Sequence, residues 1–173
     1  MIFRLSQKLT TKIKAGRLES LPAEENPFAD WSAHLFSVDR AQYILLSNTK
    51  TLYSVVFPGK GITSDRFFIG EAMSSIREFL RADSLEFVYH QFIVPSTASV
   101  RFAKALDRSV TGSMIDLIKF ATGMIGDGTS PLLVGSMLNE IPMSALATSE
   151  SKHYGMPRKV FQLLANSKQR LDI

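Results

Sequence analysis

Three consecutive segments rich in aromatic and β-branched residues place the strongest constraint on the fold of this chain. They span residues 31–38, 42–47 and 52–57, and their composition is typical of strands. The links between them, Asp39-Arg40 and Asn48-Thr49-Lys50, have the length of turns. Because a parallel return needs a crossover of about a dozen residues, these segments are expected to be antiparallel neighbours. The sequence therefore predicts a three-stranded meander.

Helical periodicity and two further short strands surround the meander. Within residues 66–82 the apolar positions recur at spacings of four, three and four, which predicts a helix. Further helices are predicted from Ser6 to about residue 14, over 85–92 and after Asp107, and short strands near 3–5 and 99–104. In order, the elements are strand, helix, three strands, two helices, strand and helix. We expect an α+β fold with a mixed, mainly antiparallel sheet.

The last third of the chain has a different composition. Residues 123–131 contain three glycines and a proline, which indicates a flexible connector. Helices are predicted beyond it at 132–139, near 142–148 and at 157–166, with Pro157 in a first-turn position. We therefore expect an α+β domain over residues 1–122 and a helical extension, 123–173, that packs back on it.

Composition excludes several classes of protein. The 173 residues are 45% hydrophobic, which is enough for one buried core and argues against disorder. With no cysteine, the chain has no disulfide scaffold, thiolate zinc site or cysteine nucleophile. No apolar run approaches the roughly 20 residues that cross a bilayer, and the start lacks the apolar stretch of a secretory signal. We expect a cytoplasmic protein without a membrane segment.

Charge is unevenly distributed behind the net value of +4. Residues 1–18 carry five basic side chains and no acidic one, residues 19–39 carry five acidic and no basic ones, and residues 141–173 carry five basic against two acidic ones. If the extension packs on the sheet, the two basic segments are expected to meet in space. The alternative is that these lysines and arginines simply cover helix surfaces.

The sharpest basic cluster lies where a predicted strand leads into a predicted helix. Free backbone amides at a helix start attract anions, and neighbouring cations strengthen that attraction. The predicted anion-binding residues are Arg101, Lys104, Arg108, Ser109 and Thr111, with Lys8 and Lys12 in support. The alternative is that Asp107 is only the helix cap and that Arg108 pairs with a nearby acid.

The three histidines, His34, His90 and His153, suggest only a weaker catalytic hypothesis. None lies in a metal-binding spacing, so no metal site and no cofactor are expected. In an enzyme acting on a phosphodiester or a nucleotide, His34 or His90 would be the acid–base group and Arg108 would hold the phosphate. The glycines of 123–128 lack the following Lys-Ser/Thr of a phosphate-binding loop.

Three strings of the sequence carry a resemblance: Gln7-Lys8-Leu9, the run from Trp31 to Phe36, and Arg108-Ser109-Val110-x-Gly112-Ser113-Met114. They are similar to a family of uncharacterised bacterial proteins known as a domain of unknown function. The likeness spans about residues 1–122. It implies no activity, cofactor or catalytic residue.

The leading functional hypothesis is a non-enzymatic binding module for an anionic partner, with nucleic acid as one candidate. The phosphodiester- or nucleotide-directed enzyme is the first alternative. The second is a protein–protein interaction module or homo-oligomer. Phe67, Phe68 and Phe92 would line an interface with the tail or with a second subunit, and the alternative is that they belong to the core.

Overall fold

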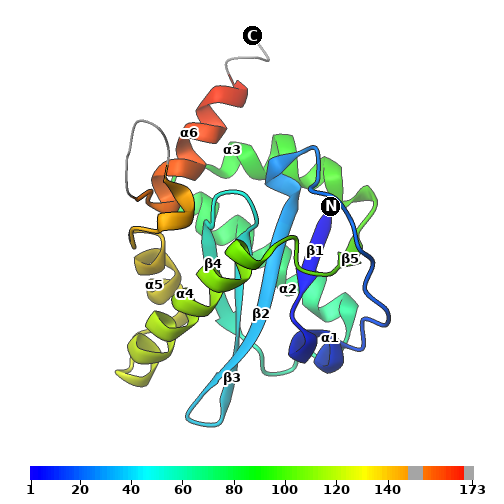
Figure 1. Cartoon of the computed structure of the whole chain (residues 1–173), viewed down its shortest axis with the longest axis vertical. Helices are drawn as coiled ribbons and strands as arrows, with labels where there is room; N and C mark the ends of the chain where they lie inside the picture. The colour runs from blue at the N-terminus through cyan, green and yellow to red at the C-terminus, as the bar shows by residue number, and fades with distance from the viewer. Residues whose placement is uncertain (148–153, 170–173) are drawn as a thin grey trace.

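A five-stranded sheet forms the centre of the molecule, as a computed structural model describing residues 1–147 and 154–169 shows (Figure 1). The strand order is β4-β3-β2-β1-β5. The strands are β1 (Ile2–Leu5), β2 (Asp30–Val38), β3 (Ala41–Asn48), β4 (Ser54–Pro58) and β5 (Arg101–Ala103). The predicted meander is confirmed, because β2, β3 and β4 pair antiparallel. Strand β1 pairs parallel with both β2 and β5 through shorter ladders, so the α+β fold has a mixed, mainly antiparallel sheet.

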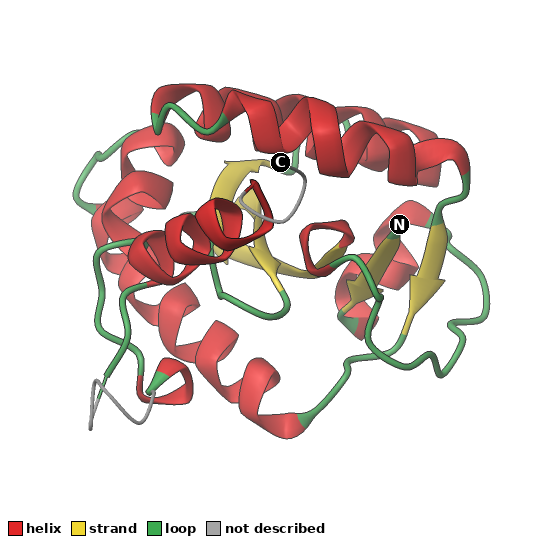
Figure 2. Cartoon of the chain, turned by 90° about the horizontal axis from the view of Figure 1, so that it is seen from above, coloured by secondary structure: helices red, strands yellow, loops and turns green. Residues whose placement is uncertain are grey.

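Helices cover both faces of this sheet, as the view from above shows (Figure 2). Most of them begin at capping side chains: Ser6, Ser64, Asp107 and Ser130 each accept a hydrogen bond from a first-turn amide of the helix that follows. The helices are α1 (Gln7–Ile13), α2 (Asp65–Ala82), α3 (Glu86–Val88) continued by a wider turn over Tyr89–Ile93, α4 (Arg108–Gly126), α5 (Pro131–Leu138) and α6 (Pro157–Gln169). Short 3₁₀ turns lie at Pro27–Ala29, Val94–Ala98 and Ser144–Leu146.

Alternation along the strands creates two cores. On β2, Trp31 and Ala33 face the core that α1 and α2 cover, whereas Phe36 and Val38 face the core that α4 and α5 cover. Of the adjacent phenylalanines of α2, Phe68 is fully buried in the first core, whereas Phe67 is 62% exposed. Strands β2, β3 and β4 therefore contribute to both cores, whereas β1 and β5 contribute to the first.

The C-terminal extension packs against the sheet end at which β2 begins. The Phe161 ring of α6 lies 4.6 Å from the Tyr53 ring, and Arg158 Nε donates to Asp83 Oδ2 over 3.0 Å. Asp83 also accepts a hydrogen bond of 2.6 Å from the Tyr53 hydroxyl. Burial and this hydrogen bond raise the pKa of Tyr53 well above its usual range. These contacts join α6 to α2 and to the β3–β4 loop.

Two expectations about this extension are wrong. Helix α4 continues to Gly126 instead of ending before a connector at 123, because Met124 and Ile125 continue its apolar face onto the second core. The described parts of the two basic segments do not meet either. Helix α1 follows the carboxyl end of β1, whereas α6 packs at the opposite end of the sheet, and the two helices lie far apart in Figure 1.

The remaining predictions for the extension are confirmed in part. The helix predicted at 157–166 is α6, and the one at 132–139 is α5. The piece predicted near 142–148 is a single 3₁₀ turn, and its last residue, Thr148, lies outside the described residues, as does His153. Within the described residues, no helix combines the length and the apolar character that a bilayer crossing requires.

Candidate functional site

A buried arginine organises the part of the sheet next to the candidate site. The Arg4 side chain on β1 donates from Nε and Nη2 to the two carboxylate oxygens of Asp30 on β2, each over 2.8 Å. It also donates to the backbone carbonyls of Leu21, Pro22 and Lys104 over 3.1, 2.7 and 3.3 Å. Arg4 is only 2% exposed. This cation is fully engaged in holding the fold and is not free to bind a ligand.

The same ion pair fixes two loops over the sheet. The carboxylate of Asp30 accepts a hydrogen bond of 3.0 Å from the Glu24 amide, which anchors the loop that contains Leu21 and Pro22. The contact with the Lys104 carbonyl anchors the link between β5 and α4. Arg4 thereby helps to place the start of α4 above β1 and β2.

Two neighbouring hollows lie between α1 and α4, and we call the pair the α1–α4 groove. The upper hollow has a volume of about 280 Å³ and the lower one about 750 Å³, and they share Gln7. The upper hollow is lined by Arg4, Leu5, Ser6, Gln7, Ser32, His34, Ala105, Val110, Thr111 and Met114. The lower hollow is lined by Gln7, Lys8, Thr11, Leu35, Phe36, Ser37, Gln42, Ile118 and Thr122.

The groove is elongated and free of acidic groups. Strand β2 and helix α4 supply lining residues in chain order, from Ser32 and Val110 in the upper hollow to Ser37 and Thr122 in the lower one. At 1.5 Å per residue, the α4 segment alone spans about 18 Å. Among the residues that the structure describes, no aspartate or glutamate lines either hollow. The groove can therefore receive an extended anion without carboxylate repulsion from its walls.

Five of the seven predicted anion-binding residues lie at this groove or beside it. Lys8 and Thr111 line it directly. Lys12 donates from Nζ to Oε1 of Gln42, a lining residue, over 2.7 Å. Arg108 precedes Thr111 by three positions and is its neighbour on the surface of α4, and exposed Lys104 adjoins the lining residue Ala105.

The other two predicted residues lie elsewhere. Arg101 on the edge strand β5 forms an ion pair of 2.5 Å with Glu19. Ser109 faces a different cavity, described below. The interpretation of Asp107 as a helix cap is confirmed, because its Oδ1 accepts from the Val110 amide over 2.8 Å. The Asp107 cap therefore satisfies one of the free backbone amides at the start of α4.

The structure separates the two histidines of the catalytic hypothesis. His34 lines the upper hollow, where burial lowers its pKa and so favours the neutral imidazole. His90 is exposed on the far side of the α3 region, with Nε2 3.6 Å from Oε1 of Glu86. Only His34 belongs to the groove. Within residues 1–147 and 154–169, no cluster of metal-ligating side chains is found.

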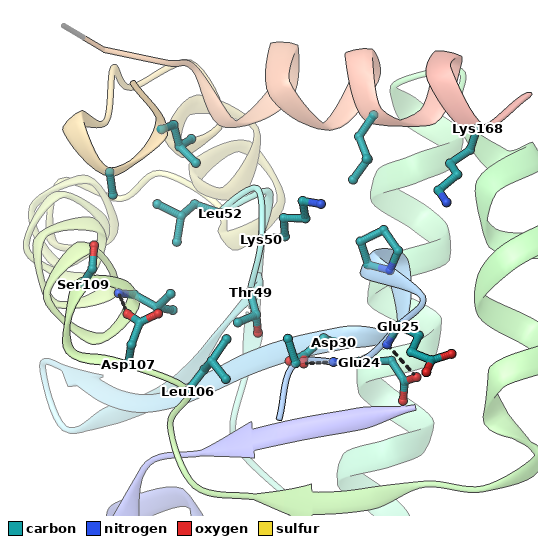
Figure 3. Close-up of a pocket in the computed structure, with 16 residues that line it drawn as sticks. Glu24, Glu25, Asp30, Thr49, Lys50, Leu52, Leu106, Asp107, Ser109 and Lys168 are labelled. Carbon is teal, nitrogen blue, oxygen red and sulfur yellow. Dashed lines mark hydrogen bonds between the residues drawn. The ribbon is translucent and has the colours of Figure 1, made fainter. Parts of the chain in front are cut away.

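A second cavity, which the sequence did not predict, lies where the extension meets the sheet (Figure 3). We call it the junction cavity. It has a volume of about 490 Å³ and is bounded by the loop at 23–27, the β3–β4 loop, the start of α4, the 3₁₀ turn at Ser144–Leu146 and α6. No local sequence signal could have revealed it, because its walls come from five separate segments.

Comparison with known families supports the sequence resemblance and extends it. A family model described as Domain of unknown function (DUF6933) matches residues 2–160. The chain belongs to this family. The DUF6933 match continues past residue 122 through α5 into the first residues of α6, so the expectation that the likeness ends near 122 was too short. No curated protein and no solved structure matches the chain.

Proposed function

We propose that this DUF6933 protein is a binding module that takes a single-stranded nucleic acid in the α1–α4 groove. The observation that carries the proposal is the combination of walls without carboxylates and cations at intervals beside them. Lys8 lies in the lower hollow, and Lys12 is joined to its lining through Gln42. Lys104 directly precedes Ala105 of the upper hollow in the sequence, and Arg108 lies about one helical turn before Thr111.

Each phosphate that pairs with such a cation releases condensed counterions, which favours binding at low salt. The proposal therefore predicts an affinity that falls steeply as ionic strength rises. The lower hollow also offers apolar surface from Leu35, Phe36 and Ile118. Proteins that hold single strands combine a cationic track with apolar and aromatic surface for the bases.

The shape of the groove favours an extended strand over a single nucleotide. The path along α4 is about 18 Å long, and the flanking cations are distributed along it. A mononucleotide carries its charge at one end and would engage one of these cations at a time.

Fluorescence anisotropy of a labelled oligothymidylate about ten nucleotides long tests the proposal. We expect Lys8→Glu to weaken binding and to lower the slope of log affinity against log salt by about one. Arg108→Ala should weaken binding as well. The matched control is Arg66→Glu, which makes the same charge change at an exposed residue of α2 that lines neither hollow.

An affinity that does not change with salt would contradict the proposal and favour the protein-interaction alternative. Equal losses in Lys8→Glu and Arg66→Glu would also contradict it, because they would reflect net charge and not the groove.

A phosphodiester-directed enzyme is the second candidate, favoured by the position of His34 in the same groove. A neutral imidazole can accept a proton at neutral pH, and Thr111 shares the upper hollow with it. RNA cleavage that is abolished in a folded His34→Gln variant and retained in His90→Gln would support this activity. If the unmodified protein does not cleave RNA, this second candidate function is excluded.

A further inference from the structure

We propose that the junction cavity binds a small zwitterion that carries an ammonium and a carboxylate at one end and an apolar body at the other, as a free apolar amino acid does. The cavity shares Val110 with the upper hollow of the groove, but neither Lys8 nor Lys12 lines it. Its volume of about 490 Å³ falls within the range of small-molecule sites.

The charged groups of the cavity gather on one side. In Figure 3, Lys168, Glu24 and Glu25 lie on one side, Lys50 lies near the middle with its ammonium group directed toward that side, and Asp107 and Ser109 lie at the opposite end, beyond Leu52. The lysines come from the β3–β4 loop and α6, and the glutamates come from the loop before β2. Opposite charges therefore approach one end of the cavity from different segments.

These charges do not neutralise one another directly. Among the described residues, Glu25, Lys50 and Lys168 have no ion-pair partner within 4.0 Å, and Glu24 has only the amino terminus of Met1 at 3.9 Å.

The other two carboxylates in the lining are already engaged. Asp30 binds Arg4 through both oxygens, and Asp107 caps α4. Two ammonium groups and the Glu25 carboxylate thus remain to recognise a ligand that bears both charges. Glu24 stands beside them, with one oxygen 3.9 Å from the amino terminus of Met1 and the other accepting a hydrogen bond of 3.1 Å from the Glu25 amide.

The remaining walls are mainly apolar. Leu52, Leu106, Val110, Leu146 and Leu164 line the cavity. A purely ionic ligand would leave this surface in contact with water, whereas an apolar side chain would cover it. An α-amino acid meets both demands, because its two charges share one carbon and its side chain extends away from them.

Isothermal titration calorimetry on the full chain tests the proposal with L-tryptophan, N-acetyl-L-tryptophan and L-tryptophanamide. We expect L-tryptophan to bind most tightly, since the acetylated compound lacks the ammonium and the amide lacks the carboxylate. Lys50→Met should weaken the binding of L-tryptophan about tenfold and affect the amide little. Glu25→Gln should weaken the binding of L-tryptophan similarly and affect the acetylated compound little.

Two control variants separate the loss of a cavity contact from the loss of charge alone. Lys119→Met and Glu71→Gln remove the same charges from exposed helix positions that do not line the cavity, and they should leave binding unchanged. No measurable binding at millimolar concentrations, or equal binding of the three compounds, would overturn the proposal. Oligothymidylate affinity, measured in the same variants, reports separately on the groove.

Discussion

Arg4 and Lys8 stand four positions apart in the same basic segment, yet the fold gives them opposite environments. Arg4 is 2% exposed, and carboxylate and carbonyl oxygens surround its guanidinium. Lys8 is exposed beside a groove that no described acidic residue lines. The number of cations in a segment therefore says little about ligand binding. Strand β1 places the charge of Arg4 inside the protein, whereas helix α1 places the charge of Lys8 on the surface.

The largest expected effect tests the buried side of this comparison. Replacing Arg4 with methionine leaves Asp30 without its partner in a buried site, and we expect a loss of about 3–5 kcal/mol in the free energy of unfolding. Urea denaturation followed by circular dichroism measures it. Lys8→Met is the matched control and should change the free energy by less than about 0.5 kcal/mol. Similar losses in the two variants would contradict the distinction between them.

The difference between Arg4 and Lys8 also marks what sequence reasoning could and could not predict. The meander, α2 and α4 depend on local signals, namely short links, apolar periodicity and the caps Ser64 and Asp107, and these were predictable. The burial of Arg4 depends on Asp30, which follows 26 positions later, and on carbonyls of two distant loops. No local pattern encodes such contacts.

In the candidate site, too, local signals predicted the residues but not their arrangement. Four basic residues, Lys8, Lys12, Lys104 and Arg108, and the neighbouring Thr111 were predictable as a set, because composition and the start of α4 identify them. Their arrangement beside one groove depends on the parallel pairing of β1 with β2, which is a long-range contact. Arg101 was included in that set because sequence could not reveal its pairing with Glu19, 82 positions away.

A second, partly buried charge cluster, where α6 meets α2 and the β3–β4 loop, extends the comparison. Asp83 accepts hydrogen bonds from Tyr53 and Arg158 and so joins α6 to the core. We expect Asp83→Asn to cost about 1–3 kcal/mol, because a charge-assisted hydrogen bond is lost at a partly buried site. Thermal denaturation checks it, with the exposed Glu78→Gln of α2 as control. An unchanged melting temperature would show that the extension does not depend on this carboxylate.

A smaller effect concerns pH and the half-buried His34 of the groove. Burial lowers the pKa of His34 below its ordinary value of 6.5, so the unfolded chain binds a proton more readily than the folded one. Its contribution to stability is therefore complete above about pH 6.5 and is lost as the pH falls toward the lower, folded pKa. Urea midpoints measured across this range should fall less steeply in His34→Gln than in the unmodified protein. The same slope in both proteins would contradict the prediction, and His90→Gln provides the exposed control.

The smallest expected change in stability is that of a Lys8 variant, and it tests the contrast with Arg4 most directly. Lys8→Met removes an exposed charge without leaving a buried partner, so the free energy of unfolding should stay within about 0.5 kcal/mol of its original value. The same variant should nevertheless lower the salt slope of oligothymidylate binding by about one, since a single phosphate contact is lost. Parallel denaturation and anisotropy titrations on one preparation separate the two quantities. A stable Lys8→Met protein with an unchanged salt slope would mean that Lys8 contacts no phosphate, and the groove would lose the only free cation that lines it within the described residues.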